Sequence, residues 1–463
     1  MFKPTTDLGF INFFCHAIQI KVCNDTMMRL QETVKSFFRG ISIRKKLKPL
    51  IVFLATVISI PLLIVAVQSQ QPVTVKVLIQ ALEAAQLEPI VKDFEAENPD
   101  INLEIVEAPN DTNKVEDLYT SAFLLGESPY DLVYMDIVWT PKFAAAGWLK
   151  DLSDRVSQEE LDQFLDGDVN GGMYDGGLYR MPFRSDAGML YYRSDWLKDA
   201  GYEPPETFSE LMKISQALQE EGYTDWGYVW QGKQYEGLSA MFVEILEGFD
   251  AFWVNPETLE VGLDQPNAIE AVKFLRSTIE ENVSPPGVTT YSEEPTRRLF
   301  QNGETAFLRN WPYVYGLASE SDIAGKFAIK PMPHAPKGSN GACQGGWGMG
   351  IAKNTDHPEE AWRVVKYFSQ AKTQKKYALQ TGYVPSRREL FNDSELVEKY
   401  SYLPELLNVI ENAVLRPPIA QYSQASDILQ RYLSAAIAGT MEPEKAMNAA
   451  ARETRTLLKR SQS

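Results

Sequence analysis

Cysteine and histidine are both rare in this chain of 463 residues, which has three of each. No CxxC or HxxxH spacing occurs, so the sequence predicts no metal site, no cofactor and no structural disulfide. Catalysis by Ser-His-Asp or Cys-His groups would need His334 or His357, which lie in polar, proline-flanked stretches typical of surface loops. The six residues are Cys15, Cys23, Cys343, His16, His334 and His357.

Positive charge is scarce beyond the N-terminal region. The whole chain carries a formal charge of -17, and residues 70–463 hold 36 Lys and Arg against 59 Asp and Glu, a balance of -23. No basic stripe appears after residue 70. Such a chain binds phosphate backbones and anionic membranes poorly, which argues against nucleic acid as a partner.

A long apolar run, Leu50–Val67, follows a basic stretch, Arg39–Lys48. Small residues then precede Gln70 as a cleavage site, so we expect residues 36–70 to direct export to the periplasm. The run is also long enough to anchor the protein in a membrane. Cleavage and anchoring are both open, and translation could begin within Met27–Met28.

At 463 residues the chain exceeds the usual size of a single core, so we expect two domains. From Val73, short apolar runs alternate with helical patterns, which predicts a parallel sheet covered by helices. Ligands bind at the carboxyl ends of strands in such sheets, and Asp136 stands at one such end. Strands are predicted at Val73–Leu78, Ile101–Val106 and Leu132–Met135, and helices at Leu82–Glu97 and Asn113–Leu125.

Helices dominate beyond residue 190. After Glu304 the pattern predicts strands to about Pro333, and helices return from Pro358 to Leu458. The earlier helices are predicted at Thr207–Glu221, Leu238–Gly248, Gln265–Glu281 and Glu294–Gln301.

Two apolar runs between Arg180 and Leu197 are joined by the small, polar turn Ser185–Gly188. We interpret this stretch as a strand, a crossing and a second strand. Small residues let the backbone pack closely there, so the Asp186 carboxylate can face a cleft. A turn-capping role for Asp186 is an equal alternative from this stretch alone.

Five separated stretches, in one order, resemble the extracellular solute-binding proteins of carbohydrate ABC transporters (family 1), and among them most closely the trehalose/maltose-binding proteins. The resemblance covers the chain from about Val73 to its end. The stretches are Met135–Trp139, Arg180–Leu197, Val229–Gly237, Glu304–Tyr313 and Gly345–Gly350.

The resemblance implies an α/β, two-lobed periplasmic-binding-protein fold of type II, like that of maltose-binding protein, with three interlobe crossings. It implies a monomer that closes on an α-glucoside, such as trehalose, maltose, sucrose or glucosylglycerol, and presents it to the permease subunits of an ABC transporter. The expected parts are an N-terminal extension with the export segment (1–69), an N-lobe (70–185 and 310–352) and a C-lobe (186–309 and 353–463).

A neutral sugar has ring faces of C–H groups and a rim of hydroxyls. Its binding therefore calls for aromatic rings against the face and for carboxylates and amides at the rim. The chain has nine Trp and 21 Tyr. Trp347 stands among glycines, which suits a ring exposed in a cleft. The resemblance implies sugar contacts at Glu83 (in the loop after the first strand), Asp136, Asp186, Tyr235, Glu236, Trp311, Gly346, Trp347 and Arg387.

Two positions depart from the close relatives. Arg184 occupies the place of an aromatic residue two positions before the acid in the strand, and Glu116 lies where those relatives carry arginines. An arginine has thus moved from one wall of the site to another. We expect Arg184 and Glu116 to influence which sugar is selected.

Two alternatives share these features. A glycoside hydrolase also places paired carboxylates in an aromatic cleft, and it needs them at a fixed separation, one with a raised pKa. A sugar-sensing receptor subunit would share the same fold and site. The resemblance, however, is to proteins that are not enzymes.

Overall fold

The computed structural model describes residues 72–126 and 128–461. The predicted export segment, its cleavage site and the alternative starts all lie outside this range. Within it, no helix combines the length and apolar character needed to cross a bilayer.

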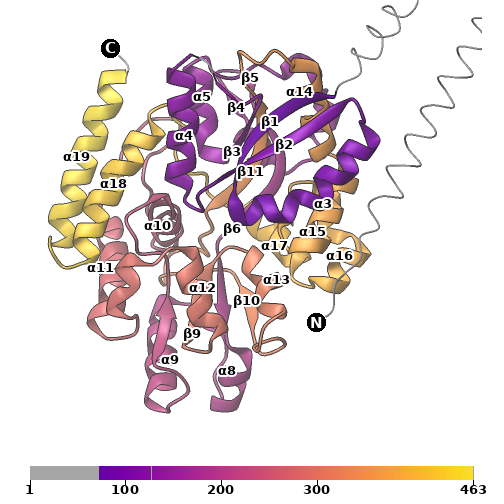
Figure 1. Ribbon diagram of the computed structural model, residues 1–463. Coiled ribbons are helices and arrows are strands. Elements are labelled where there is room, and N and C mark those ends of the chain that lie inside the picture. The colour runs from indigo at the N-terminus through magenta and orange to yellow at the C-terminus, as the bar shows by residue number, and fades with distance from the viewer. Residues whose placement is uncertain (1–71, 127, 462–463) are drawn as a thin grey trace, which may run out of the picture. The chain divides into compact units, whose positions relative to one another are not determined.

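Two mixed β-sheets form the frame of the described chain (Figure 1). The first begins as predicted: β1 pairs in parallel with β2 and with β3, one helix connects β1 to β2, and another connects β2 to β3. The remaining strands of this sheet come from much later in the chain, and β11 runs antiparallel to β3 and β6. Its strand order is β12 (Val384–Pro385), β6 (Met181–Ala187), β11 (Gln344–Ile351), β3 (Leu132–Asp136), β1 (Val73–Gln80) and β2 (Ile101–Ala108), with helices α3 (Ala81–Glu97) and α4 (Thr112–Leu124).

The second sheet has four strands and lies below the first in Figure 1. The predicted helices at 207–221, 238–248, 265–281 and 294–301 are confirmed beside it, and the last two helices of the chain pack on α10 and α11. The strand order is β10 (Ala328–Lys330), β7 (Met189–Tyr192), β9 (Thr305–Asn310) and β8 (Trp226–Val229). The helices are α9 (Phe208–Glu220), α10 (Glu236–Gly248), α11 (Pro266–Glu280), α12 (Glu293–Gln301), α18 (Tyr422–Ile437) and α19 (Pro443–Ser461).

Short elements connect these layers. Two of them, α14 and α15, pack beside the first sheet, where α14 contacts β1, β6 and β11. The full set of these elements is η1 (Ile137–Trp139), α5 (Thr140–Ala145), η2 (Ser153–Arg155), α6 (Gln158–Leu161), α7 (Asp166–Asn170), β4 (Met173–Tyr174), β5 (Gly177–Leu178), α8 (Ser194–Ala200), η3 (Pro286–Thr290), α13 (Tyr313–Ser319), α14 (Pro358–Phe368), α15 (Ala371–Thr381), η4 (Arg388–Asn392), α16 (Ser394–Lys399) and α17 (Leu403–Glu411).

Three expectations for the later chain are wrong in detail. The strands expected up to Pro333 are interrupted by the helix α13. Strand β10 pairs with β7, so the chain returns to the first sheet between Lys330 and Gln344 and not at residue 310. Residues 353–385 then remain with the first sheet, because β12 pairs with β6. The expected lobe boundaries came from the family resemblance, which does not determine how the later strands of this chain pair.

The chain first passes between the sheets at Gly188, because β6 ends at Ala187 and β7 begins at Met189. The expected four-residue turn is thus shorter, since Ser185 and Asp186 belong to the strand. A Cβ atom on Gly188 would lie 1.7 Å from Glu244 Oε1, so only glycine fits at this crossing.

The second and third passages run side by side. Cys343, just before β11, forms a parallel bridge with Val414, which lies between α17 and α18. The backbone N–H of Gln344 donates to the Val414 carbonyl oxygen at 2.9 Å. Together with Gly188, these segments form the hinge region between the two sheets.

Candidate functional site

A cavity of about 350 Å³ opens among the residues that the structure describes, and both sheets contribute to its wall. The first sheet supplies the ends of β1 and β3 and the middle of β6 and β11. The second supplies the first turns of α10 and α12 and the chain after β9. The site residues expected from the sequence that line it are Glu83, Asp136, Arg184, Asp186, Tyr235, Glu236, Trp311, Gly346 and Trp347.

A buried arginine cluster forms one end of the cavity. Arg184 Nε donates to Glu83 Oε1 at 2.9 Å, and Nη2 donates to Glu83 Oε2 at 3.1 Å. Its Nη1 donates to Asp186, and its guanidinium lies 4.4 Å from the centre of the Tyr383 ring. Glu83 therefore orients Arg184. It lies in the first turn of helix α3, and not in a loop as expected.

Asp186 keeps an unused acceptor in this cluster. The residue is 5% exposed, and its Oδ1 atom has no hydrogen-bond partner in the described parts of the chain. Burial raises the pKa of Asp186 to about 7, although the neighbouring Arg184 opposes this shift. Asp186 therefore offers a hydrogen-bonding atom to a ligand in the cavity.

A second arginine, Arg416, bridges acids that belong to different sheets. Its Nη2 donates to Asp136 Oδ1 at 2.8 Å, and its Nη1 donates to Glu236 Oε1 at 2.7 Å. Asp136 ends β3, whereas Glu236 begins α10. Glu236 also accepts from the hydroxyls of Tyr422 and Ser426. Burial raises the pKa of Glu236, against the attraction of Arg416.

The aromatic residues differ in how far they are exposed. Trp347 is only 7% exposed, because it packs against Tyr134 and Trp139 with ring centroids 5.1 and 5.3 Å away. The expectation of an exposed platform free of neighbouring side chains is therefore wrong for Trp347, although it still borders the cavity. Trp311 is half-buried and stacks with Arg309, whose guanidinium carbon lies 4.1 Å from the ring centroid.

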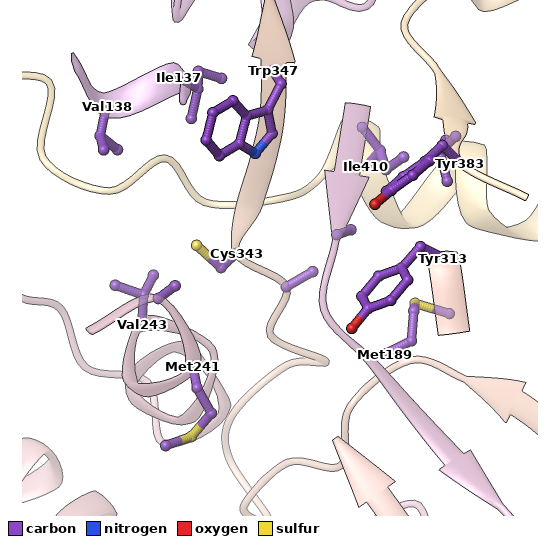
Figure 2. Packing of buried hydrophobic residues seen from close by; sticks show 14 of the residues in the cluster. Ile137, Val138, Met189, Met241, Val243, Tyr313, Cys343, Trp347, Tyr383 and Ile410 are labelled. Carbon is purple, nitrogen blue, oxygen red and sulfur yellow. The ribbon is translucent and has the colours of Figure 1, made fainter. Parts of the chain in front are cut away.

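Figure 2 shows Trp347 on strand β11, with Tyr313 and Tyr383 on the opposite side of β6. Trp347 projects from β11 toward Ile137, while Tyr313 and Tyr383 lie beyond β6 with stacked rings 5.7 Å apart. Gly346 has a φ of 139°, a conformation that favours glycine. A Cβ atom there would lie 2.9 Å from the Arg184 carbonyl oxygen.

Two expected residues do not line the cavity. Arg387 is buried elsewhere, where Nε donates to the Ser369 carbonyl oxygen at 2.7 Å and the guanidinium stacks on Phe164 at 4.3 Å. Glu116 accepts a hydrogen bond from Lys142 Nζ at 2.9 Å. It is also not among the residues that line the cavity. Arg387, expected as a sugar contact, and Glu116, expected to influence sugar selection, are thus not among the residues that line the cavity.

Several lining residues were missed from the sequence. Arg416 lies in a connection without hydrophobic periodicity, and Tyr383 precedes the two-residue strand β12. For α12, the sequence does contain a signal for a helix N-terminus, because Ser292 precedes two acidic residues. This signal could have indicated that polar groups at the start of α12 contribute to the site. The missed residues with charged or aromatic side chains are Asp111, Glu293, Glu294, Arg298, Tyr313, Tyr383 and Arg416.

Comparison with known proteins gives consistent matches. Residues 80–375 match the family described as bacterial extracellular solute-binding protein. A probable ABC transporter-binding protein of Deinococcus radiodurans is 33% identical over 335 residues, which cover 70% of this chain and 79% of that protein. A maltotriose-binding protein of Pyrococcus abyssi is 25% identical over 324 residues, covering 69% of this chain and 67% of that protein.

Solved structures confirm the expected fold class. The maltose-bound protein MalE3 of T. maritima shares 36% identity, with a TM-score of 0.79 over 83% of this chain and all of that chain. A solute-binding protein of Thermotoga lettingae, 24% identical, matches with a TM-score of 0.76 over 84% of this chain and all of that chain. The fold is thus the two-lobed type II architecture, with one lobe built on each sheet.

Proposed function

Because this chain belongs to the family of bacterial extracellular solute-binding proteins, we propose that it captures an α-linked glucoside and delivers it to the permease of an ABC importer. At the coarser level it is a sugar-binding subunit of an ABC transporter. The candidate ligands are trehalose, maltose, sucrose and glucosylglycerol. The observation that carries the proposal is the cavity between the sheets, where Trp311 and Trp347 stand beside ion-paired acids.

The lining groups suit the two surfaces of a sugar. Trp311 is half-buried, so part of its ring is available for the C–H groups of a sugar face. Asp186 Oδ1 is a free acceptor, and Asp136 and Glu236 add carboxylates held in place by Arg416. Fixed carboxylates bind hydroxyl groups with less loss of side-chain entropy than mobile ones.

The size and charge of the cavity narrow the class of ligand. Its volume of about 350 Å³ lies near the lower end of the range of ligand pockets, roughly 300 to 1,000 Å³. This favours a disaccharide or a glucoside of similar size over longer chains. Seven acids and three arginines line the cavity, so phosphorylated sugars and uronates should be repelled.

Closure of the two lobes supplies the signal to the permease. Lys233 Nζ donates to Asp111 Oδ2 at 3.0 Å, and the Glu236 amide donates to Asn113 Oδ1 at 3.0 Å. Both bonds join the lobe of the first sheet to the lobe of the second. A ligand that contacts both lobes favours this closed arrangement, and the permease can distinguish it from an open one.

The proposed location is the periplasm, with residues 36–70 as the export signal or anchor and the protein acting as a monomer. Membership of an extracellular solute-binding family supports export. The family and fold are those of binding proteins and not of enzymes. A hydrolase would also have paired acids in an aromatic cleft, one of them with a raised pKa like that of Asp186, so release of glucose from disaccharides is the control assay.

Tryptophan fluorescence tests the proposal, with the chain from Gln70 titrated with trehalose, maltose, sucrose, glucosylglycerol, glucose and a few amino acids. A saturable change with one or two glucosides would support it. Folded protein that responds to none of the glucosides would refute the proposed ligand class. Glucose release that Asp186→Asn abolishes would instead support a hydrolase.

A further inference from the structure

Three polar side chains are buried behind the floor of the cavity without lining it. Asp168 and Arg180 have no exposed surface, and Gln344 is 1% exposed. Asp168 lies in α7, Arg180 directly precedes β6, and Gln344 begins β11. None of the three has a role in the sugar contacts described above, so their burial requires a separate explanation.

Hydrogen bonds hold the three side chains in one cluster. Gln344 Nε2 donates to Asp168 Oδ1 at 3.2 Å and to Ser185 Oγ at 3.1 Å. Arg180 Nη1 donates to the backbone oxygen of Asp168 at 3.1 Å. Burial raises the pKa of Asp168 to about 7 and lowers the pKa of Arg180, while their mutual attraction opposes both shifts.

Four atoms of this cluster lack a partner among residues 72–126 and 128–461. Two are acceptors, Asp168 Oδ2 and Gln344 Oε1, and two are donors, Arg180 Nε and Nη2. Leaving buried polar atoms without partners is strongly unfavourable. A metal ion would be repelled by Arg180, and an anion by the oxygens of Asp168 and Gln344. Water can donate to both acceptors and accept from both donors.

The cluster lies directly against the glycine stretch of β11. A Cβ atom on Gly346 would be 2.7 Å from Asp168 Oδ1, and one on Gly348 would be 2.8 Å from Arg180 Nε. Gln344 Nε2 also donates to the Gly345 carbonyl oxygen at 2.9 Å. Gly345, Gly346 and Trp347 line the cavity, so the same backbone has the cluster behind it and the ligand space in front.

We propose that Asp168, Arg180 and Gln344 form a buried hydrated site that holds about one or two water molecules, because a buried water makes roughly three hydrogen bonds. We further infer that this site positions the Gly345–Trp347 backbone for the sugar. The second part rests on the proposed sugar-binding function. Asp168, Arg180 and Gln344 are thus positioning residues that act through β11.

A crystal structure of the protein, at a resolution that shows ordered water, tests the hydrated site directly. Water should lie within hydrogen-bonding distance of Asp168 Oδ2 and of Arg180 Nε or Nη2. The absence of water there, with these atoms still unpaired, would overturn the proposal. This test does not depend on whether any sugar binds, so it separates the hydrated site from the proposed function.

The double variant Asp168→Leu with Arg180→Met tests the positioning role. It removes both charges together, so neither is left buried and unpaired. We expect a Tm close to that of the wild type, but sugar binding weaker by about tenfold, the effect of losing roughly one hydrogen bond to the sugar. Wild-type affinity in a stable double variant would overturn the positioning role.

The variant Asp168→Asn serves if the double variant does not fold, because it keeps the shape of the side chain and changes an acceptor into a donor. Sugar binding should weaken by about threefold, less than the full effect of a lost hydrogen bond. Unchanged affinity would contradict the positioning role. A wild-type protein that binds no sugar would refute the proposed function and leave the crystallographic test valid.

Discussion

Replacing Arg416 by methionine should destabilise the protein and weaken sugar binding together. The Arg416 side chain is 2% exposed and forms ion pairs of 2.8 Å with Asp136 and 2.7 Å with Glu236. Its removal would leave two carboxylates, each with a side chain 10% exposed, close to one another without their counter-ion. Breaking a buried pair in this way costs about 3–5 kcal/mol of unfolding free energy.

Urea unfolding measures this loss, with Arg363→Met as the matched control. Arg363 also pairs with an acid, Asp100, at 2.5 Å, but both side chains are largely exposed, and exposed pairs contribute little. Adding Glu236→Gln to Arg416→Met should recover part of the stability, because one unpaired charge is removed. If Arg416→Met is no more destabilising than Arg363→Met, the buried pairs of Arg416 contribute no more stability than an exposed pair.

Further predictions address the ligand, pH, closure and backbone. Trp311→Ala should weaken sugar binding by about 1–3 kcal/mol through lost stacking and buried area, as titration calorimetry would show. Because the pKa of Asp186 is raised to about 7, the folded protein binds a proton that the unfolded chain releases near pH 4. Tm should therefore fall as pH rises from about 4 to 7 and then level off, and Asp186→Asn should reduce that fall. Lys233→Ala removes the partly exposed ion pair with Asp111 that joins the lobes, and it should weaken sugar binding by up to about fivefold. Gly346→Ala should lower stability by about 1–3 kcal/mol, measured in urea, because φ is 139° there.

Controls separate these effects. Trp362 is half-buried, and the Arg155 guanidinium carbon lies 5.7 Å from the centroid of its ring. Trp362 does not line the cavity, so Trp362→Ala should leave sugar affinity unchanged. Equal losses for Trp311→Ala and Trp362→Ala would argue against a sugar contact at Trp311. A Tm profile that Asp186→Asn leaves unaltered would assign the titration to another group, such as Asp168, whose pKa is also raised to about 7.

The sequence was most informative where local patterns decide the structure. The alternation from Val73 correctly predicted β1, β2 and β3 with their helices, because strand and helix periodicities are local properties. The motifs around Asp136, Asp186 and Trp311 were also brought into one cavity, as the family resemblance implied.

The failures concern contacts between distant segments. Arg416 lies 280 positions from Asp136, and no local pattern connects the two. Arg387 was expected in the cavity, but Glu160 and Gln163 bind its guanidinium elsewhere. Trp347 is buried because Tyr134 and Trp139 come from other elements to cover it. The side chains around a residue are determined by tertiary packing, which composition and spacing do not reveal.

Titration calorimetry with trehalose, maltose and sucrose determines whether the cavity is an α-glucoside site, with wild-type protein and Trp311→Ala compared under the same conditions. We expect saturable binding of one sugar per chain to the wild type and weaker binding to Trp311→Ala. Folded wild-type protein that binds none of the three sugars, or sugar binding that Trp311→Ala leaves unchanged, would be evidence against an α-glucoside site at Trp311.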